Sequence, residues 1–279
     1  MTPTRRAAIA GAGVLIAGAA PWRPRVVSLN PCLDAIVVRV ADRGQIAALS
    51  HYARDPSQSG IADIARTLPF TYETAEEIVA LRPDLVLASA HSSPATRAAL
   101  ARLGIRQEVF GVSDTVADSL GQVRRIAALV GHADRGQALV AAITAALARA
   151  APPPGFTPVT ALVFEPEGLV AGEGTLIDDM LRRAGFINAA KRYGLGKWDN
   201  VAMEKLLADP PRVLLSARVG TGGETWAERF VRRPALAGLG GRMIQADFPQ
   251  RLLYCGGPTL IDTAAALAAA RDKVAERRA

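Results

Sequence analysis

Nitrogen and sulfur donors that could bind a metal occur at a few widely spaced positions of this 279-residue chain. Cys32, His51, His91 and Cys255 each follow a short apolar run of the kind that forms buried strands. Thiolate sulfur and imidazole nitrogen are ligands that zinc, copper and haem iron accept. Cys32, His51 and Cys255 therefore form a candidate metal set, although their long-range spacing matches no short metal motif.

The same side chains have other possible roles. Cys32 and Cys255 could pair as a disulfide in an oxidising compartment. His51 could hydrogen-bond a loop carbonyl, and each cysteine could be a small buried hydrophobic residue. Disulfide formation, burial and metal ligation stay open as alternative hypotheses for the two cysteines.

Aromatic side chains share these predicted loops. An aromatic ring can stack on a flat macrocycle or a catecholate at little cost in entropy, although a ring such as Trp198 could equally pack at the edge of the fold. Arginines on loops, among them Arg54 and Arg251, could grip a carboxylate, but exposed arginines are common. The candidate ligand-binding residues are Cys32, His51, Tyr52, Phe70, Tyr72, His91, Trp198, Arg218, Tyr254 and Cys255, with Trp226 on a further loop.

The elements that must position these residues alternate along the chain. Short apolar runs predict strands at 25–29, 45–49, 85–89, 107–110, 159–164, 213–216 and 242–246. Longer segments between them predict helices at 33–40, 73–81, 94–103, 116–130, 176–184, 201–208, 225–231 and 260–278, with Trp198 in a loop rich in Gly and Lys. This alternation predicts an α/β fold with parallel sheets, in which ligands bind beyond the carboxyl ends of strands.

One long helix is expected at 134–151, with Asp134 as its N-cap and Pro152 to Pro154 ending it. Sequence on its two sides is similar. Glu76, Pro83 and Leu85 recur as Glu204, Pro211 and Val213 at one constant offset, each copy reading as a short helix, a turn with Pro and a buried strand. We therefore expect two similar lobes, at 21–132 and 153–279, joined by a bridging helix at 133–152, with a ligand cleft between them.

The N-terminal twenty residues have the pattern of an export signal. Arg5 and Arg6 precede an apolar stretch at 7–20 that is too short to span a bilayer, and small residues at 17–19 suit cleavage. An uncleaved anchor is the alternative. We expect residues 1–20 to be a cleavable signal peptide and the mature protein to be periplasmic.

Charge and motifs narrow the function classes. The formal charge of +7 is spread over scattered arginines, without the basic runs interleaved with aromatics that bind nucleic acid, so no nucleic-acid partner is expected. A metal-dependent hydrolase using the Cys and His set is one alternative. Against it, the sequence has no G-x-S-x-G, H-E-x-x-H or P-loop motif and only three histidines.

The chain resembles the periplasmic solute-binding proteins of ABC importers for cobalamin, haem and ferric siderophores. The resemblance is carried by Arg25 to Pro31, Glu76 to Val86, Leu103 to Ile105, Gly172 to Leu176 and Trp198 to Leu215. It implies two α/β lobes bridged by one helix, capture of a metal chelate between them and no enzymatic activity or intrinsic cofactor. It also implies a monomer that delivers its ligand to a permease dimer with its ATPase.

The resemblance assigns roles to several positions. Glu76 and Glu204, already paired by the internal repeat, match the glutamates with which the family docks on permease arginines, although each could be an ordinary glutamate of a helix start. Tyr52 and Trp198 match positions that often carry a cleft aromatic, and Cys32 stands where the family often has Ser. Cobalamin is the first expected ligand, followed by a ferric siderophore or haem. A zinc or copper binding protein is the alternative.

A glycine-rich turn at 172–175 precedes a predicted helix. Its backbone amides could bind an anion. A tight strand-to-helix connection explains the same pattern, so both interpretations stay open.

Overall fold

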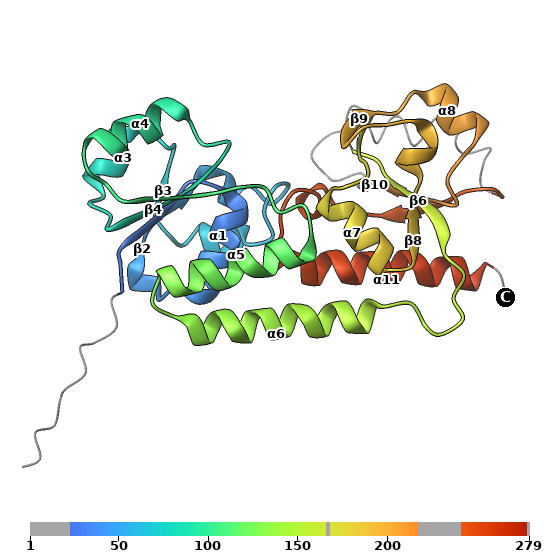
Figure 1. Ribbon diagram of the computed structural model, residues 1–279, viewed down its shortest axis with the longest axis horizontal. Helices are drawn as coiled ribbons and strands as arrows, with labels where there is room; N and C mark the ends of the chain where they lie inside the picture. The colour runs from blue at the N-terminus through green and yellow to red at the C-terminus, as the bar shows by residue number, and fades with distance from the viewer. Residues whose placement is uncertain (1–22, 166–167, 217–240, 278–279) are drawn as a thin grey trace, which may run out of the picture.

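The computed structural model describes residues 23–165, 168–216 and 241–277. Two α/β lobes lie side by side along the long axis of the molecule, and a long helix runs beneath both (Figure 1). The predicted fold class of two lobes with parallel-rich sheets and one connecting helix is confirmed. We call them the N lobe, which precedes the helix, and the C lobe, which follows it; the exact boundaries at 132 and 153 stay a prediction.

The N lobe is built on a five-stranded parallel sheet in the order β3-β2-β1-β4-β5. Its central strands are buried throughout, as expected for a parallel sheet that helices cover on both faces. The strands are β1 (Val26–Ser28), β2 (Ile46–Ser50), β3 (Phe70–Thr71), β4 (Leu85–Ser89) and β5 (Gln107–Phe110). The helices are α1 (Pro31–Val40), α2 (Ala62–Ala65), α3 (Ala75–Ala80), α4 (Pro94–Arg102) and α5 (Val116–Leu129), with 3-10 turns at Arg43–Gln45 and His51–Arg54.

The C lobe repeats this plan with a four-stranded parallel sheet in the order β11-β10-β6-β8. Its strands are β6 (Val159–Val163), β8 (Phe186–Asn188), β10 (Val213–Ser216) and β11 (Ile244–Asp247). An antiparallel pair, β7 (Leu169–Ala171) and β9 (Trp198–Asn200), lies beside it. The helices in the described part of this lobe are α7 (Leu176–Arg183), α8 (Met203–Ala208) and α11 (Thr259–Glu276), with 3-10 turns at Ala189–Tyr193 and Gln250–Leu252.

The prediction of a loop around Trp198 was wrong. Trp198 pairs with Ala171 in the β7–β9 ladder, so its backbone is strand. The pattern was hidden because this strand is only three residues long and all of them are exposed. Ladder hydrogen bonds with β7, rather than an apolar run, hold the strand in place.

The connecting helix α6 (Ala133–Ala150) packs against α5 and α11. In Figure 1 α6 runs along the underside of the molecule, with α5 above its N-terminal half and α11 above its C-terminal half. The prediction that Asp134 caps this helix was wrong. His132 is the N-cap and makes no side-chain cap bond, while Asp134 lies in the first turn, where a carboxylate favours the helix dipole.

The internal repeat is visible as equivalent elements. α3 and β4 in the N lobe correspond to α8 and β10 in the C lobe, and both strands lie in the interior of their sheets. Glu76 and Glu204 each lie exposed in the first turn of their helix. In Figure 1 α3 and α8 lie at the upper ends of the two lobes, away from α6.

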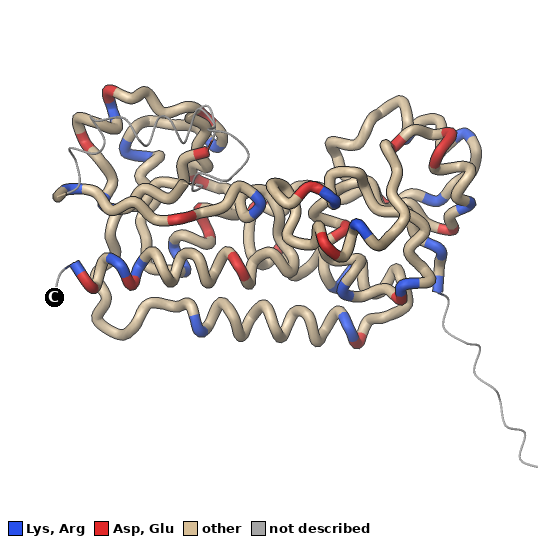
Figure 2. The backbone as a smooth tube through the Cα atoms, turned by 180° about the vertical axis from the view of Figure 1, so that it is seen from behind, with Lys and Arg blue, Asp and Glu red and all other residues tan. Residues whose placement is uncertain are grey.

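Charged residues of both signs are interspersed over the two lobes (Figure 2). Among the described residues, none of the helices is long and apolar enough to cross a membrane. The expected signal peptide at 1–20, the predicted helix at 225–231, Arg218 and Trp226 all lie outside the described residues.

Candidate functional site

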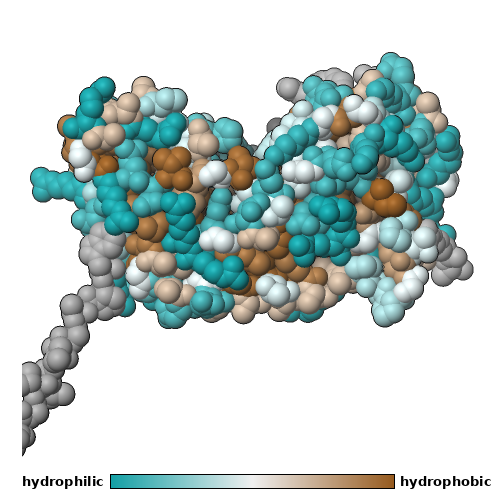
Figure 3. All heavy atoms as spheres, viewed as in Figure 1, coloured by the Kyte–Doolittle hydropathy of each residue, from teal (hydrophilic) through white to brown (hydrophobic). Residues whose placement is uncertain are grey.

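A cavity of about 230 Å³ lies between the two lobes. In Figure 3 a notch separates the upper parts of the lobes. The N-lobe lining residues come from the start of α1, the ends of β4 and β5, the loops after β1, β4 and β5, and α5. The C-lobe lining residues come from β9 and the segment before α11. The lining residues are Asn30, Cys32, Leu33, Ser89, His91, Phe110, Gly111, Val112, Ser113, Gln122, Trp198, Tyr254 and Gly256.

Strand direction explains why these loops meet. The five N-lobe strands are parallel, so the loops after β1, β4 and β5 leave the same edge of the sheet. The loop after β1 turns directly into α1, where the Asn30 side chain accepts a hydrogen bond from the Cys32 amide at 2.9 Å. This N-cap fixes Cys32 at the start of the helix and beside the cavity.

The C-lobe wall of the cavity is an aromatic pair, Trp198 and Tyr254. Their ring centroids are 5.9 Å apart, and the residues are 40% and 50% exposed, so both keep a face toward solvent. The β7–β9 pairing holds Trp198, and the Gly172 amide donates to the Lys197 carbonyl at 2.9 Å. A side chain at Gly172 would lie 3.0 Å from the carbonyl carbon of Gly196, so this close approach requires glycine.

A second group of aromatic residues lies on the N lobe, at the ends of β2 and β3. The His51 ring lies 3.9 Å from Tyr52 and 5.1 Å from Tyr72, centroid to centroid. Phe70 meets Tyr72 edge-on at 5.4 Å, and the Arg54 guanidinium stacks over Phe70 at 4.3 Å. We call His51, Tyr52, Phe70 and Tyr72 the N-lobe aromatic group.

The N-lobe aromatic group borders an open hollow of about 500 Å³ between the strand ends, α3 and α4. Because β2 is next to β1 in the sheet, this hollow lies on the same sheet edge as the interlobe cavity. Tyr72 is the most exposed of these rings, at 62%. Tyr72 and His51 thus lie together on this edge.

Two acidic residues lie close to these strand ends, Asp34 of α1 against Ser50 and Glu73 after β3. Burial raises the pKa of the Asp34 carboxyl to about 8, even though the Ser50 amide and hydroxyl donate to it at 3.1 and 2.6 Å. Burial also raises the pKa of Glu73 to about 6. Within the described part of the chain, Glu73 Oε1 and His51 Nδ1 are buried without a hydrogen-bond partner.

Glu165 is a third buried carboxyl, on the C lobe. Burial raises the pKa of Glu165 to about 8. The pKa of Tyr254 is also raised, chiefly by burial and in smaller part by the charge of the Glu165 carboxylate. Neither carboxylate oxygen has a hydrogen-bond partner among the described residues. Burial therefore favours the protonated, neutral form of Glu165.

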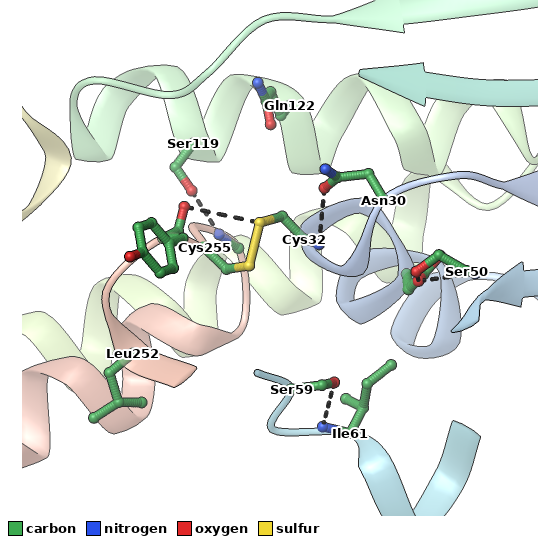
Figure 4. Close-up of a disulfide and its surroundings, with 12 residues drawn as sticks. Asn30, Cys32, Ser50, Ser59, Ile61, Ser119, Gln122, Leu252 and Cys255 are labelled. Atoms are coloured by element: carbon green, nitrogen blue, oxygen red, sulfur yellow. Dashed lines mark hydrogen bonds between the residues drawn. A yellow bond between two sulfur atoms is a disulfide. The ribbon is translucent and has the colours of Figure 1, made fainter. Parts of the chain in front are cut away.

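The cysteines form the disulfide that was one of the three hypotheses for them. Cys32 at the start of α1 is bonded to Cys255 in the segment before α11 (Figure 4), with their Cα atoms 4.9 Å apart. The metal set of Cys32, His51 and Cys255 is therefore wrong for the oxidised protein, because both sulfurs are bonded to each other. No group of three or more His, Cys, Asp or Glu residues suited to a metal ion gathers in the regions that the structure describes.

The glycine-rich turn at 172–175 is a tight connection rather than an open amide nest. The Gly174 amide faces Asp178 at 3.3 Å, and the Thr175 hydroxyl accepts from the Asp178 amide at 3.1 Å while donating to the Gly172 carbonyl at 2.8 Å. The residues of the turn therefore satisfy one another. This geometry favours the structural interpretation of the motif over anion binding.

The structure thus divides the predicted ligand residues between two places. Cys32, His91, Trp198 and Tyr254 line the interlobe cavity, and Cys255 is bonded to Cys32 beneath it. His51, Tyr52 and Tyr72 line the neighbouring hollow, with Phe70 against Tyr72. Arg251 lines a different hollow, near α11.

Other cavity residues escaped the sequence analysis. Phe110 to Ser113 follow strand β5, so the strand-end rule could have found them. Gln122 has no sequence signal, because it lies in the middle of α5 and reaches the cavity only through tertiary packing. Glu165 was missed because a glutamate after a strand usually points into solvent.

A family model described as periplasmic binding protein matches residues 26–240. No curated protein matches the chain. Among solved structures, the periplasmic heme-binding protein RhuT from Roseiflexus is 25% identical, with a TM-score of 0.69 over 89% of this chain and 99% of that one.

More distant structures share the fold. A periplasmic heme-binding protein from Pseudomonas aeruginosa is 24% identical, with a TM-score of 0.68 over 88% of this chain and 92% of that one. The vitamin B12 binding protein BtuF of Vibrio cholerae is 16% identical, with a TM-score of 0.69 over 92% and 99% of the two chains.

Proposed function

Because the chain belongs to the periplasmic binding protein family, we propose that it is the substrate-binding component of an ABC importer that captures a metal-bearing tetrapyrrole between its lobes. The family and its structural relatives bind substrates for transport, and capture followed by release needs no covalent chemistry. Among tetrapyrroles we place haem first and cobalamin second, and a ferric siderophore third.

The observation that carries this proposal is the N-lobe aromatic group. Tyr72 and His51 lie in one aromatic cluster with ring centroids 5.1 Å apart, and Tyr and His are both axial ligands of haem iron. Sequence reasoning alone ranked cobalamin first. Exposed Tyr72 moves haem ahead, because cobalamin does not need a phenolate donor from the protein, and the relative at 25% identity is a heme-binding protein.

The dimensions of the cavity suggest how such a ligand would sit. Its 230 Å³ is below the roughly 300–1,000 Å³ of pockets that enclose drug-sized ligands, so a macrocycle would occupy the open cleft above it. Only a substituent of the ring would enter the cavity. Asn30, Ser89 and Gln122 could hydrogen-bond a carboxylate there, while Trp198 and Tyr254 offer ring faces to the macrocycle.

We further propose that Glu76 and Glu204 dock the protein on its permease. Both are exposed in the first turns of equivalent helices, α3 and α8, which lie at the tips of the two lobes (Figure 1). A rigid pair of carboxylates at these tips suits a symmetric permease dimer with its ATPase.

The test is a titration of the mature protein with haemin, cyanocobalamin and a ferric hydroxamate, followed by absorbance and tryptophan fluorescence. We expect saturable binding of haemin with a shifted Soret band. Tyr72→Phe removes the oxygen donor and should change that band and weaken binding at least about tenfold, a loss of about 1.4 kcal/mol. Trp198→Ala should weaken binding by a similar factor without changing the band.

Leu103→Ala is the matched control, since Leu103 is 61% exposed on the N lobe but lines neither hollow. If only cyanocobalamin bound, cobalamin rather than haem would be the ligand. Absence of binding by all three compounds would refute the proposed ligand class. Unchanged haemin affinity in Trp198→Ala would remove Trp198 from the site.

A further inference from the structure

The disulfide joins the two lobes rather than two parts of one lobe. Cys32 is the second residue of α1 in the N lobe, and Cys255 precedes α11 in the C lobe, 223 residues later. The lobes are therefore connected covalently at two places, through α6 on the underside and through this bond beside the cavity (Figures 1 and 4).

The segment that carries Cys255 is packed tightly against the N lobe. The Gly257 amide donates to the Ser119 hydroxyl of α5 at 2.6 Å. A side chain on Gly257, whose φ is +60°, would lie 2.7 Å from Ile36 of α1. The Tyr254 carbonyl oxygen lies 3.7 Å from the Cys32 sulfur. Residues 254–257 thus belong to the C lobe by sequence and to the N-lobe surface by contact.

This segment also carries one wall of the cleft. Tyr254 is adjacent to Cys255 and stacks near Trp198, so the position of the aromatic pair depends on how the segment is anchored. The other polar contacts between the lobes near the cavity are reversible. They include the Val116 amide donating to Asp179 at 2.9 Å and the ion pair of Lys197 with Asp114 at 2.6 Å.

Hydrogen bonds and exposed ion pairs of this kind are individually weak and can break and re-form. A covalent bond does not break with thermal motion. Lobes joined by both α6 and a disulfide therefore have a smaller range of relative motion than lobes joined by α6 alone.

We propose that the Cys32–Cys255 disulfide is an interlobe clasp that holds the cleft at one width, and that a dithiol reductant releases it. While oxidised, the clasp limits lobe opening and keeps Tyr254 beside the cavity. Reduction frees the 254–257 segment and lets the lobes separate further. The consequence for ligand affinity rests on the proposed function, whereas the consequence for lobe motion does not.

The greater exposure of Cys32 favours attack by a reductant on its sulfur, from the cleft side. Cys255 is buried, whereas Cys32 is partly exposed and lines the cavity. One thiolate of the reductant attacks the Cys32 sulfur, forming a mixed disulfide and releasing Cys255, which takes up a proton. The second thiolate attacks the reductant's own sulfur in that mixed disulfide, so the reductant becomes a disulfide and Cys32 leaves as a thiolate. Two electrons pass to the protein.

The location of Cys32 favours this last step. Its amide lies in the first turn of the 10-residue helix α1, where the helix dipole stabilises a thiolate. A more stable leaving thiolate departs faster in thiol–disulfide exchange.

The test measures the distance between the lobes in the mature protein. Spin labels are attached at Ala101 in α4 and Ala208 in α8, both exposed, through unnatural amino acids, so that no cysteine is added. The oxidised protein should give a narrow distance distribution. Treatment with a dithiol reductant, or the double variant Cys32→Ser with Cys255→Ser, should broaden the distribution and shift it to longer distances. Haemin dissociation should become at least about fivefold faster.

The double variant treated with reductant is the control and should not change further. Chemical reduction of the unmodified sequence keeps the test valid if the double variant folds poorly. Identical distance distributions before and after reduction would overturn the clasp. Failure of haemin to bind in either state would contradict the proposed ligand, while the distance measurement would still decide whether the clasp exists.

Discussion

At the scale of single residues, two buried carboxyl groups have strongly raised pKa values. Asp34 and Glu165 both have a pKa raised to about 8 by burial, but their surroundings differ. Ser50 donates two hydrogen bonds to Asp34, so this carboxyl takes part in the structure of the N lobe. Glu165 has no such partner in the described regions and is the better probe of burial alone.

We predict that Glu165→Gln flattens the dependence of stability on pH. The raised pKa means that, between about pH 4.5 and 8, the folded state binds more protons than the unfolded state. The free energy of unfolding therefore falls as pH rises through this range, by at most about 1.4 kcal/mol per pH unit for one site. Glutamine does not titrate, so the variant should lose this slope.

Urea titrations at pH 5, 6, 7 and 8 measure this slope. Glu276→Gln, an exposed position at the end of α11, is the matched control and should keep it. Equal slopes in the Glu165 variant and the unmodified protein would show that Glu165 is ionised in the folded state.

At the scale of elements, the contact between α5 and α6 sets where the connecting helix lies. Gly136 of α6 is buried, and a side chain there would collide with Ala127 of α5. Gly121 of α5 is exposed, and a side chain there would meet nothing within 4 Å. The two glycines therefore have different roles, although both lie within helices.

We predict opposite effects of alanine at these two positions. Gly136→Ala should destabilise the protein by about 1–3 kcal/mol, because the added methyl group overpacks the helix contact. Gly121→Ala should stabilise it by about 0.4–1 kcal/mol by restricting the unfolded chain and favouring helix. Thermal unfolding of both variants measures the difference, and a stabilising Gly136→Ala would mean that the helices can separate without cost.

At the scale of the whole molecule, two lobes carry equivalent surfaces at their tips. The repeat that gives each lobe a short helix followed by a buried strand also gives each an exposed glutamate in the first turn of that helix. The spacing of the two glutamates depends on how the lobes are held, through α6 and through the disulfide. Docking and lobe geometry are therefore coupled in our proposal.

We predict that reversing both charges, Glu76→Arg with Glu204→Arg, abolishes uptake, and that Glu204→Arg alone weakens uptake while leaving ligand affinity unchanged. Glu204 lines neither hollow, whereas Glu76 lines the hollow beside the N-lobe aromatic group, so the Glu204 variant separates docking from capture. Transport of haemin into vesicles that contain the cognate permease measures uptake, and a titration measures affinity. Reversal of the exposed Glu276 is the control, and normal transport by the double variant would refute docking through this pair.

The local elements followed from the sequence because local patterns determine them. The apolar runs that become β4 and β10, the Pro-containing turns before them and the long α6 are set by hydrophobic periodicity and by residues that stop helices. The repeat around Glu76 and Glu204 was enough to predict two similar lobes. The errors arose where a local pattern was weak, at the three exposed residues of β9 and at the start of α6.

Tertiary structure alone decided how distant side chains combine. Cys32 and Cys255 are 223 residues apart, and only the packing of residues 254–257 on α1 and α5 brings their sulfurs together instead of leaving them to a metal. Packing also separated His51 and Tyr72 from Trp198, placing them at two hollows on one sheet edge. The sequence by itself determined the elements and their order, because these depend on neighbours along the chain, whereas the site depends on neighbours in space.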